Sequence, residues 1–234
     1  MAESVPSAAE RLDAIRSRIE RARRRFGPPP EHVTLVAVSK TFDADAIIPF
    51  LDAGQRVFGE NRVQEAQAKW PALRASYDAI ELHLIGPLQT NKARDAVELF
   101  DVIQSVDRDR LAGVLRAEMD RAGRELPVFI QVNIGGEAQK AGIPIEETPA
   151  FVARCRNEHR LNVVGLMCIP PDGLPPGPYF AHLNQLAKAA GVEKLSMGMS
   201  SDFETGIAMG ATHVRVGSAL FGTRPPVAAD PMVP

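Results

Sequence analysis

Short runs of β-branched and other apolar residues alternate with longer, helix-like segments along almost the whole chain, and this order constrains the fold more than any other feature. Runs typical of strands lie at residues 33–39, 56–59, 81–86, 102–106, 128–133, 162–169, 194–198 and 212–217. Helix-like segments lie between them at 44–53, 63–70, 90–99, 108–122, 146–157, 178–190 and 203–209. Strict alternation predicts a parallel sheet with crossover helices, and eight strands predict an α/β fold closed as a single (β/α)8 TIM-type barrel.

An open, doubly wound sheet is the other fold with this alternation. Such a sheet carries a glycine-rich loop after its first strand, whereas Lys40 stands at that place here. An extra N-terminal helix over 7–25 places Leu12, Ile15 and Ile19 at helical spacing, and the prolines at 28–30 end it. We therefore expect one domain over 1–234, made of a helix and linker (1–30), the barrel (31–224) and a tail (225–234).

The charge and the cysteine content exclude several classes of protein. A formal net charge of −2 leaves no basic footprint for nucleic acid, and we interpret the basic run 21–25 as a solvated helix face that could dock a partner only by elimination. Two cysteines and five scattered histidines show neither a disulfide framework nor metal-ligand spacing. Without a signal peptide, a membrane-length apolar run or an apolar seam, we expect a cytoplasmic monomer with no membrane partner.

The first strand, Val33-Thr-Leu-Val-Ala-Val-Ser, runs directly into Lys40. Desolvation at the end of a buried strand favours the neutral, nucleophilic amine, so Lys40 is a candidate Schiff-base nucleophile. The alternative is that its side chain extends to the surface and leaves its charge in water. The other strand ends help to decide, because active sites of TIM-type barrels lie at the carboxyl ends of the strands.

Residues suited to phosphate binding follow the seventh and eighth strands. Ser200 and Ser201 precede a helix, where we expect one of them to act first of all as the N-cap, although backbone N–H groups at a helix start also bind anions. Gly217 permits close backbone approach, and Ser218 offers a hydroxyl. Arg215 alternates with two valines, so it faces the other side of its strand, toward the barrel mouth, where it could clamp a phosphate or donate to a ring nitrogen. A lysine amine, a phosphate cradle and a donor for a ring nitrogen together indicate pyridoxal 5'-phosphate (PLP).

Specific motifs are spread from position 36 to position 222. They are Val36-Ala-Val-Ser-Lys40, Phe58-Gly-Glu-Asn-Arg-Val-Gln-Glu65, His83-Leu-Ile-Gly-Pro-Leu-Gln-Thr-Asn-Lys92, Ser105-Val-Asp107, Val132-Asn133, Gly165-Leu-Met167, Leu195-Ser-Met-Gly-Met-Ser200 and Val214-Arg-Val-Gly-Ser218. In combination they resemble the PLP homeostasis proteins, single-domain barrels similar to the N-terminal domain of alanine racemase.

The resemblance implies a role for each matching site residue. PLP would form an internal aldimine with Lys40, and Arg215 would lie against the pyridine nitrogen. Three residues, Ser200, Gly217 and Ser218, would hold the phosphate. Asn61 and Asn133 would line the ring pocket.

Three positions near this site are less clear. His83 either approaches the cofactor face or is a satisfied histidine of the core. In the loop after the fifth strand, Gly135 and Gln139 stand where the family pattern has serines, which puts a hydroxyl role there in doubt. Glu137 and Lys140 keep their places in the pattern.

Two features favour a cofactor carrier over an efficient enzyme. The related racemases use a second base from a C-terminal domain, which we do not expect here, and neither Tyr77 nor Tyr179 lies at a strand end. A guanidinium does not act as an acid, so Arg215 would leave the ring nitrogen unprotonated and the cofactor a weak electron sink. We therefore expect a protein of intracellular PLP homeostasis that holds and releases PLP with little or no catalysis, with apo PLP-dependent enzymes as candidate recipients.

Three alternatives stay open. The first is a slow PLP-dependent amino-acid racemase that uses Lys40. The second is a cofactor-free Schiff-base lyase of phosphorylated sugars, which would need a second lysine or an acid beside Lys40. The third is a barrel that serves as a protein-interaction scaffold.

Overall fold

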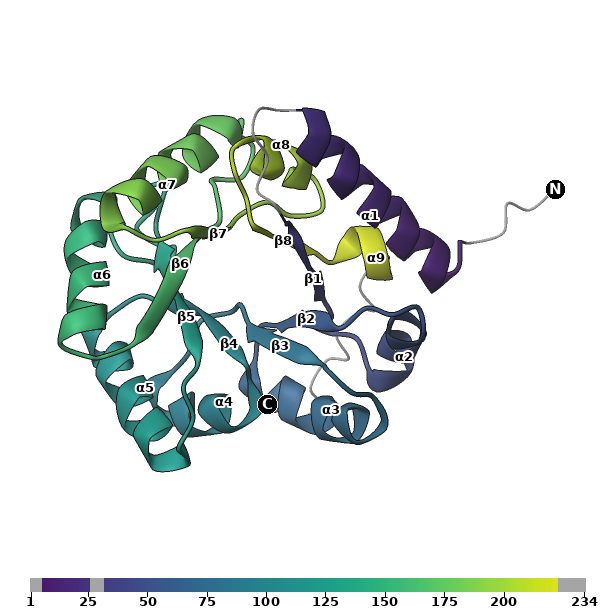
Figure 1. Cartoon of the computed structure of the whole chain (residues 1–234), viewed down its shortest axis with the longest axis horizontal. Helices are drawn as coiled ribbons and strands as arrows, with labels where there is room; N and C mark the ends of the chain where they lie inside the picture. Colours follow the sequence, from purple (N-terminus) through teal and green to yellow (C-terminus); the bar gives the residue numbers. More distant parts are fainter. Residues whose placement is uncertain (1–5, 26–31, 223–234) are drawn as a thin grey trace, which may run out of the picture.

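The computed structural model describes residues 6–25 and 32–222, and at its centre is a closed barrel of eight parallel strands (Figure 1). The strands are β1 (Thr34–Val38), β2 (Val57–Glu60), β3 (Glu81–Leu84), β4 (Val102–Val106), β5 (Pro127–Val132), β6 (Asn162–Cys168), β7 (Lys194–Ser196) and β8 (His213–Val216). Each strand pairs with the next in the chain, and β8 pairs with β1, with Ala37 opposite Val216. The predicted (β/α)8 barrel is confirmed, and the doubly wound sheet was the wrong alternative.

The helices lie around the outside of the barrel (Figure 1). They are α1 (Ala8–Arg25), α2 (Ala44–Asp52), α3 (Val63–Ser76), α4 (Ala93–Leu99), α5 (Asp109–Ala122), α6 (Thr148–Asn157), α7 (Gly177–Ala190), α8 (Phe203–Ala208) and α9 (Ser218–Phe221), with 3-10 turns η1 (Thr90–Lys92) and η2 (Ile145–Glu147) before α4 and α6. Helix α3 passes the predicted end at residue 70 and continues through Pro71, because both Trp70 and Leu73 pack into the core. The short α9 was not predicted.

Helix α1 covers one side of the barrel. It packs against α8 and α9 and buries Leu12, Ile15 and Ile19, as its spacing predicts. The prolines at 28–30 and the tail at 225–234 lie outside the described residues, so the division of the chain into helix, barrel and tail stays a prediction. None of the described helices is long and apolar enough to cross a bilayer, and the described part of the chain holds no cluster of metal-ligating side chains.

The sheet separates two interiors, because successive side chains of a strand point to opposite faces. Between the sheet and the helices lies a large apolar core, which includes the fully buried rings of Trp70, Phe100, Phe151 and Phe180. The barrel interior holds a small apolar cluster and a group of buried polar side chains. The cluster consists of Val102, Phe129 and Met167, and the polar group of His83, Gln104, Ser196 and Arg215.

Candidate functional site

Lys40 lies two residues beyond the end of β1, at the carboxyl rim of the barrel, and is half-buried. The next residue, Thr41, has a φ of +69°. This left-handed conformation is uncommon for a β-branched residue and requires support from its surroundings. The support comes from Glu65 on α3, whose carboxylate accepts a hydrogen bond from the Thr41 backbone N–H. The backbone around Lys40 is therefore held in one conformation.

A second lysine, Lys69 on α3, braces the same loop. Its ammonium donates to the carbonyl oxygen of Ser39 at 2.9 Å, to that of Phe42 at 2.8 Å and to the Glu65 carboxylate at 3.0 Å. It also forms an ion pair with Glu60 at 2.8 Å. An ammonium has three N–H donors, so these acceptors occupy all of them. Lys69 thus stabilises the backbone before and after Lys40. Because its N–H groups are all engaged, it is not the second reactive amine that a Schiff-base lyase would need.

Glu60, at the end of β2, is fully buried beneath this loop. Its Oε1 accepts hydrogen bonds from the Ser39 hydroxyl at 2.7 Å and from the Trp70 indole N–H at 3.1 Å, besides pairing with Lys69. Burial raises the pKa of Glu60, and the nearby Lys69 opposes that shift. The sequence analysis missed both residues. The spacing of Glu65 and Lys69, four apart on one helix, was the available signal.

The predicted phosphate cradle forms where the loops after β7 and β8 meet. The Ser200 hydroxyl oxygen accepts hydrogen bonds from the backbone N–H of Gly217 at 3.2 Å and of Ala219 at 3.4 Å. The predicted cap on the following helix is wrong, because the N-cap of α8 is Asp202 and Ser200 instead binds the start of α9. Local spacing could not reveal this, since the partners of Ser200 lie on the next loop. Ser218 is exposed as the first residue of α9.

Gly217 joins this cradle to the strand that carries Lys40. A Cβ atom at position 217 would lie 3.4 Å from the backbone oxygen of Val38, so the two loops approach closely at this point. Because β1 and β8 are neighbours in the barrel, the chain after Val38 and the chain after Val216 leave the sheet side by side at the same rim. Lys40 and the cradle residues therefore lie on adjacent strand ends, as predicted from their sequence positions.

Arg215 faces the barrel interior, as its alternation with valines predicts, and only 4% of the residue is exposed. Its guanidinium donates to the Ser196 hydroxyl at 2.7 Å and to the backbone oxygen of Cys168 at 2.8 Å. Burial lowers the pKa of Arg215. A guanidinium nevertheless stays protonated in proteins, so the barrel interior holds a fixed cation and hydrogen-bond donor.

Several known proteins are similar to this chain. The family model described as the alanine racemase N-terminal domain matches residues 11–225. The pyridoxal phosphate homeostasis protein of Escherichia coli (strain K12) is 42% identical over 228 residues, which cover 92% of this chain and 96% of the relative. The chain belongs to the pyridoxal phosphate homeostasis protein family. The relative of that name in Pseudomonas aeruginosa is 40% identical and covers 92% of this chain and 95% of its own.

Two solved structures of PipY from Synechococcus elongatus PCC7942 have the same fold as this member of the pyridoxal phosphate homeostasis family. One is described as without PLP and the other with PLP bound. Both are 40% identical to this chain and cover 92% of it and 100% of the PipY chain, with TM-scores of 0.81 and 0.79.

The two asparagines predicted for the ring pocket of this homeostasis family member differ in what they contact. Asn61 is half-buried against Gly86, and its side-chain amide has no hydrogen-bond partner among the described residues. Asn133 uses its amide within its own loop, where it donates to the Glu137 carbonyl at 2.9 Å and accepts from the Glu137 N–H at 3.2 Å. A contact of either with the ring stays a prediction.

The positions left open in the sequence have clear surroundings. His83 is a satisfied histidine of the interior, since Gln104 and Glu81 occupy its two ring nitrogens. Gly135 departs from the family pattern for a steric reason, because a Cβ atom there would lie 2.5 Å from Cγ of Pro171. The adjacent ammonium of Lys140 pairs with Glu137 at 2.6 Å. No hydroxyl role in this loop follows from its contacts.

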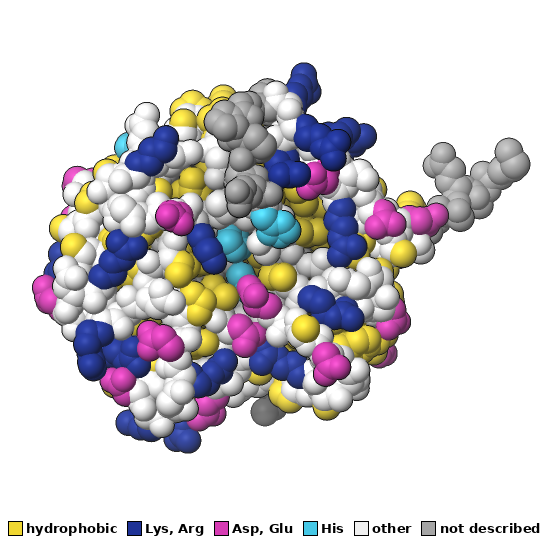
Figure 2. Space-filling view, viewed as in Figure 1, with side chains coloured by type: hydrophobic (Ala, Val, Ile, Leu, Met, Phe, Trp, Pro, Cys, Tyr) yellow, Lys and Arg dark blue, Asp and Glu magenta, His cyan; other side chains and the backbone are white. Residues whose placement is uncertain are grey.

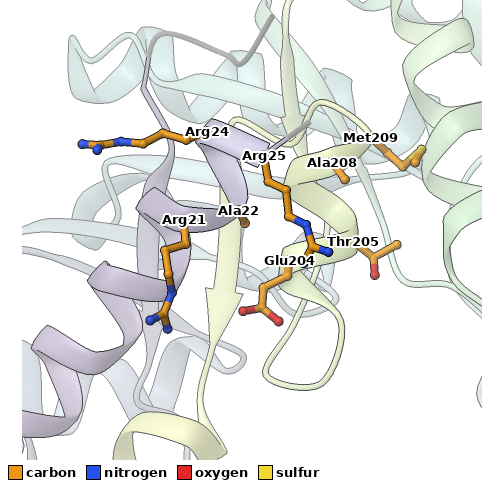
Figure 3. A pocket seen from close by; sticks show the side chains of 8 residues that line it. All are labelled: Arg21, Ala22, Arg24, Arg25, Glu204, Thr205, Ala208 and Met209. Atoms are coloured by element: carbon orange, nitrogen blue, oxygen red, sulfur yellow. The ribbon is translucent and has the colours of Figure 1, made fainter. Parts of the chain in front are cut away.

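A separate hollow of about 730 Å³ lies outside the barrel, between the end of α1 and α8. Its lining includes Arg21, Arg24 and Arg25 from the basic run, with Ala208 and Met209 opposite. Figure 3 shows the side chain of Arg25 reaching toward α8, whereas that of Arg24 points away from it. The lining of the hollow contains none of the predicted site residues.

Proposed function

We propose that this chain binds PLP at the carboxyl rim of the barrel, with the cofactor aldehyde taken by the Lys40 amine. The observation that carries the proposal is the meeting of Lys40 with the Ser200, Gly217 and Ser218 cradle across the pairing of β1 with β8. When bound, PLP supplies an aldehyde that condenses reversibly with amines. The PLP-bound structure described for PipY, 40% identical to this chain, supports the same assignment.

The donors at this rim suit the two ends of the cofactor. The hydroxyls of Ser200 and Ser218 are neutral donors, which bind a phosphate group without fixing a proton on it. The backbone N–H groups of 217 and 219 donate to the Ser200 oxygen in this structure, so a phosphate would take them in place of Ser200. At the other end, the buried Arg215 provides a permanent donor for an unprotonated ring nitrogen. Gly217 has no side chain, so its backbone can approach a bound ligand closely.

The role we assign is to hold PLP and release it, with little or no catalysis. An arginine at the ring nitrogen withholds the proton that carbanion chemistry needs, and this supports a carrier. Tyr77 donates to Asp52 at 2.7 Å, away from the rim, and Tyr179 lies within α7, so neither described tyrosine offers a base opposite Lys40. Slow amino-acid racemisation is the alternative, and it would have to use Lys40 and water.

The recipients we propose are apo PLP-dependent enzymes, in keeping with the name pyridoxal phosphate homeostasis protein that the relatives carry. All of the proposed ligands come from one chain, so a monomer is sufficient for binding. We propose that this transfer of PLP takes place in the cytoplasm, where the cell's PLP-dependent enzymes would receive the cofactor.

The decisive experiment is an absorption spectrum of the purified protein with added PLP, followed by borohydride reduction and mass spectrometry of the peptides. We expect a visible band and a pyridoxyl mass on Lys40. Lys40→Ala should lose both, whereas Lys188→Ala, at an exposed lysine of α7, should keep both. A colourless protein with unmodified Lys40 would overturn the proposal. Racemisation of a common amino acid at roughly 10 s⁻¹, an ordinary enzyme turnover, would overturn the carrier role alone.

A further inference from the structure

A chain of hydrogen bonds crosses the barrel interior from β8 to β3. Arg215 donates to the Ser196 hydroxyl at 2.7 Å, and that hydroxyl donates to the side-chain oxygen of Gln104 at 2.6 Å. The amide nitrogen of Gln104 lies 2.6 Å from Nδ1 of His83, and Nε2 of His83 lies 2.5 Å from the Glu81 carboxylate. The three middle residues are fully or almost fully inaccessible to solvent. The chain therefore links the predicted ring pocket to the opposite end of the barrel.

The direction of the bonds in this chain is set by Arg215 together with the orientation of the Gln104 amide. A guanidinium only donates, so the Ser196 oxygen accepts from Arg215, and the Ser196 hydroxyl donates to the Gln104 side-chain oxygen. The Gln104 oxygen therefore faces Ser196, and its NH₂ group donates to Nδ1 of His83. Since Nδ1 accepts, the proton of a neutral His83 is on Nε2, which donates to Glu81. All donors point from the arginine toward the carboxylate.

The common direction of these hydrogen bonds offsets part of the cost of burying the Arg215 cation. Within the described residues no carboxylate pairs with Arg215, although the residue is only 4% exposed. Oriented hydrogen bonds in a low-dielectric interior polarise one another, so the chain connects the cation to the Glu81 carboxylate through three neutral groups. The bond from His83 is the largest cause that lowers the pKa of Glu81, in agreement with this direction.

The far end of the chain reaches the surface. The Glu81 side chain is 48% exposed at the start of β3, and the ring of His213 lies 6.0 Å from that of His83. Figure 2 shows histidine side chains at the centre of the face in view, over the middle of the barrel, with acidic side chains beside them. The interior of the barrel is thus a continuous polar connection between its two ends.

We propose that Ser196, Gln104 and His83 are positioning residues that hold Arg215 in the orientation needed by the ring of PLP. This inference rests on the proposed function, because it concerns the affinity of the same site. Two donors of the guanidinium are fixed by Ser196 and Cys168, which leaves the plane of the group only one orientation. Loss of the chain should therefore weaken binding of PLP without changing any residue that touches it.

The test compares two substitutions of buried glutamines. Gln104→Leu cuts the chain, whereas Gln55→Leu removes a buried amide that donates at 2.8 and 2.7 Å to Leu35 and Val57, outside the chain. Titration of the visible band with PLP should show the affinity of Gln104→Leu lowered on the order of tenfold, the effect of about one hydrogen bond between neutral groups, and that of Gln55→Leu unchanged relative to wild type. Equal affinities of the two variants would overturn the inference.

A second measurement needs no cofactor and covers the case in which Gln104→Leu does not fold. In ¹⁵N NMR spectra of the unliganded protein, His83 should be neutral with its proton on Nε2. In Gln104→Glu, whose carboxylate only accepts, His83 should gain a proton on Nδ1. A wild-type His83 protonated on Nδ1 would overturn the inference. Absence of a visible band in the wild type would instead overturn the proposed function. The NMR result would still show whether the hydrogen bonds from Arg215 to Glu81 have the stated direction.

Discussion

The core between the sheet and the helices differs in composition and in role from the interior of the barrel. The core between the sheet and the helices consists of apolar side chains such as Trp70, Phe151 and Phe180, whose burial stabilises the fold without requiring one orientation. The barrel interior combines a small apolar cluster with a directed chain of polar groups that includes Gln104 and Arg215. The difference indicates that most of the free energy of folding comes from apolar burial outside the sheet, whereas the polar side chains inside it fix the orientation of Arg215.

The largest expected effect is on the outer core. Phe180 on α7 is fully buried, and Phe180→Ala should lower the free energy of unfolding by about 3–5 kcal/mol, through lost transfer energy and the cavity left behind. Urea denaturation would measure it. The PLP affinity of the molecules that remain folded should be unchanged. The control is Leu174→Ala, at a residue that is 53% exposed, which should change stability little. A small effect of Phe180→Ala on the free energy of unfolding would contradict the view that the core outside the sheet supplies most of the stability.

The next effect concerns the polar brace at the rim. Lys69→Met leaves the Glu60 carboxylate buried without its cation and should cost about 3 kcal/mol at pH 8. Burial raises the pKa of Glu60 in the folded state, so this group stabilises the fold below the pKa of the unfolded chain and loses that contribution as the pH rises. Stability of the variant should therefore fall from pH 5 to pH 8 more steeply than that of the wild type.

Urea denaturation of Lys69→Met at several pH values would test this slope. The matched control is the double variant Glu60→Gln with Lys69→Met, which has no buried carboxyl at this place and should lose the added pH dependence. If Lys69→Met were equally stable at pH 5 and pH 8, relative to the wild type, the buried charge would not be the cause of its instability.

The smallest effect concerns the edge of the polar interior. Burial, with the nearby His83 and Lys194, lowers the pKa of His213 to about 3. A histidine with a lowered pKa stabilises the fold above its unfolded pKa of about 6.5 and loses this contribution as the pH falls through that value toward the folded pKa. His213→Gln should therefore reduce the loss of stability between pH 7 and pH 5 by about 2 kcal/mol.

Thermal unfolding of His213→Gln at pH 7, 6 and 5 would measure this difference. His32→Gln, at an exposed histidine, serves as the control and should follow the wild type. If the wild type and His213→Gln lost stability in parallel, His213 would titrate freely in the folded protein and the interior would be wetter than its burial indicates.

The sequence predicted the outer architecture well because its signals are local. Alternation of short apolar runs with amphipathic segments was sufficient for all eight strands and for closure, and alternation within β8 was sufficient to direct Arg215 inward. The helix boundaries were less accurate. Helix α3 runs through Pro71 because the burial of Trp70 and Leu73 outweighs the local signal to stop.

The polar interior could not be predicted in the same way. The partner of Ser196 is Gln104, three strands away, and the bond depends on the register of the whole barrel. Lys69 was missed for the same reason, since its carbonyl acceptors at Ser39 and Phe42 are on another element. Ser200 was expected to cap its own helix, but the next loop supplies its partners. Long-range pairs of polar groups leave no periodic trace in a sequence.

The pairing of β1 with β8 has a consequence for folding during synthesis. A ribosome releases β1 before the other seven strands and β8 after them, so the strand that leads to Lys40 has no partner on one edge until β8 has emerged. The cradle residues at Gly217 and Ser218 emerge later still. The proposed site for PLP is therefore complete only after β8 has paired with β1.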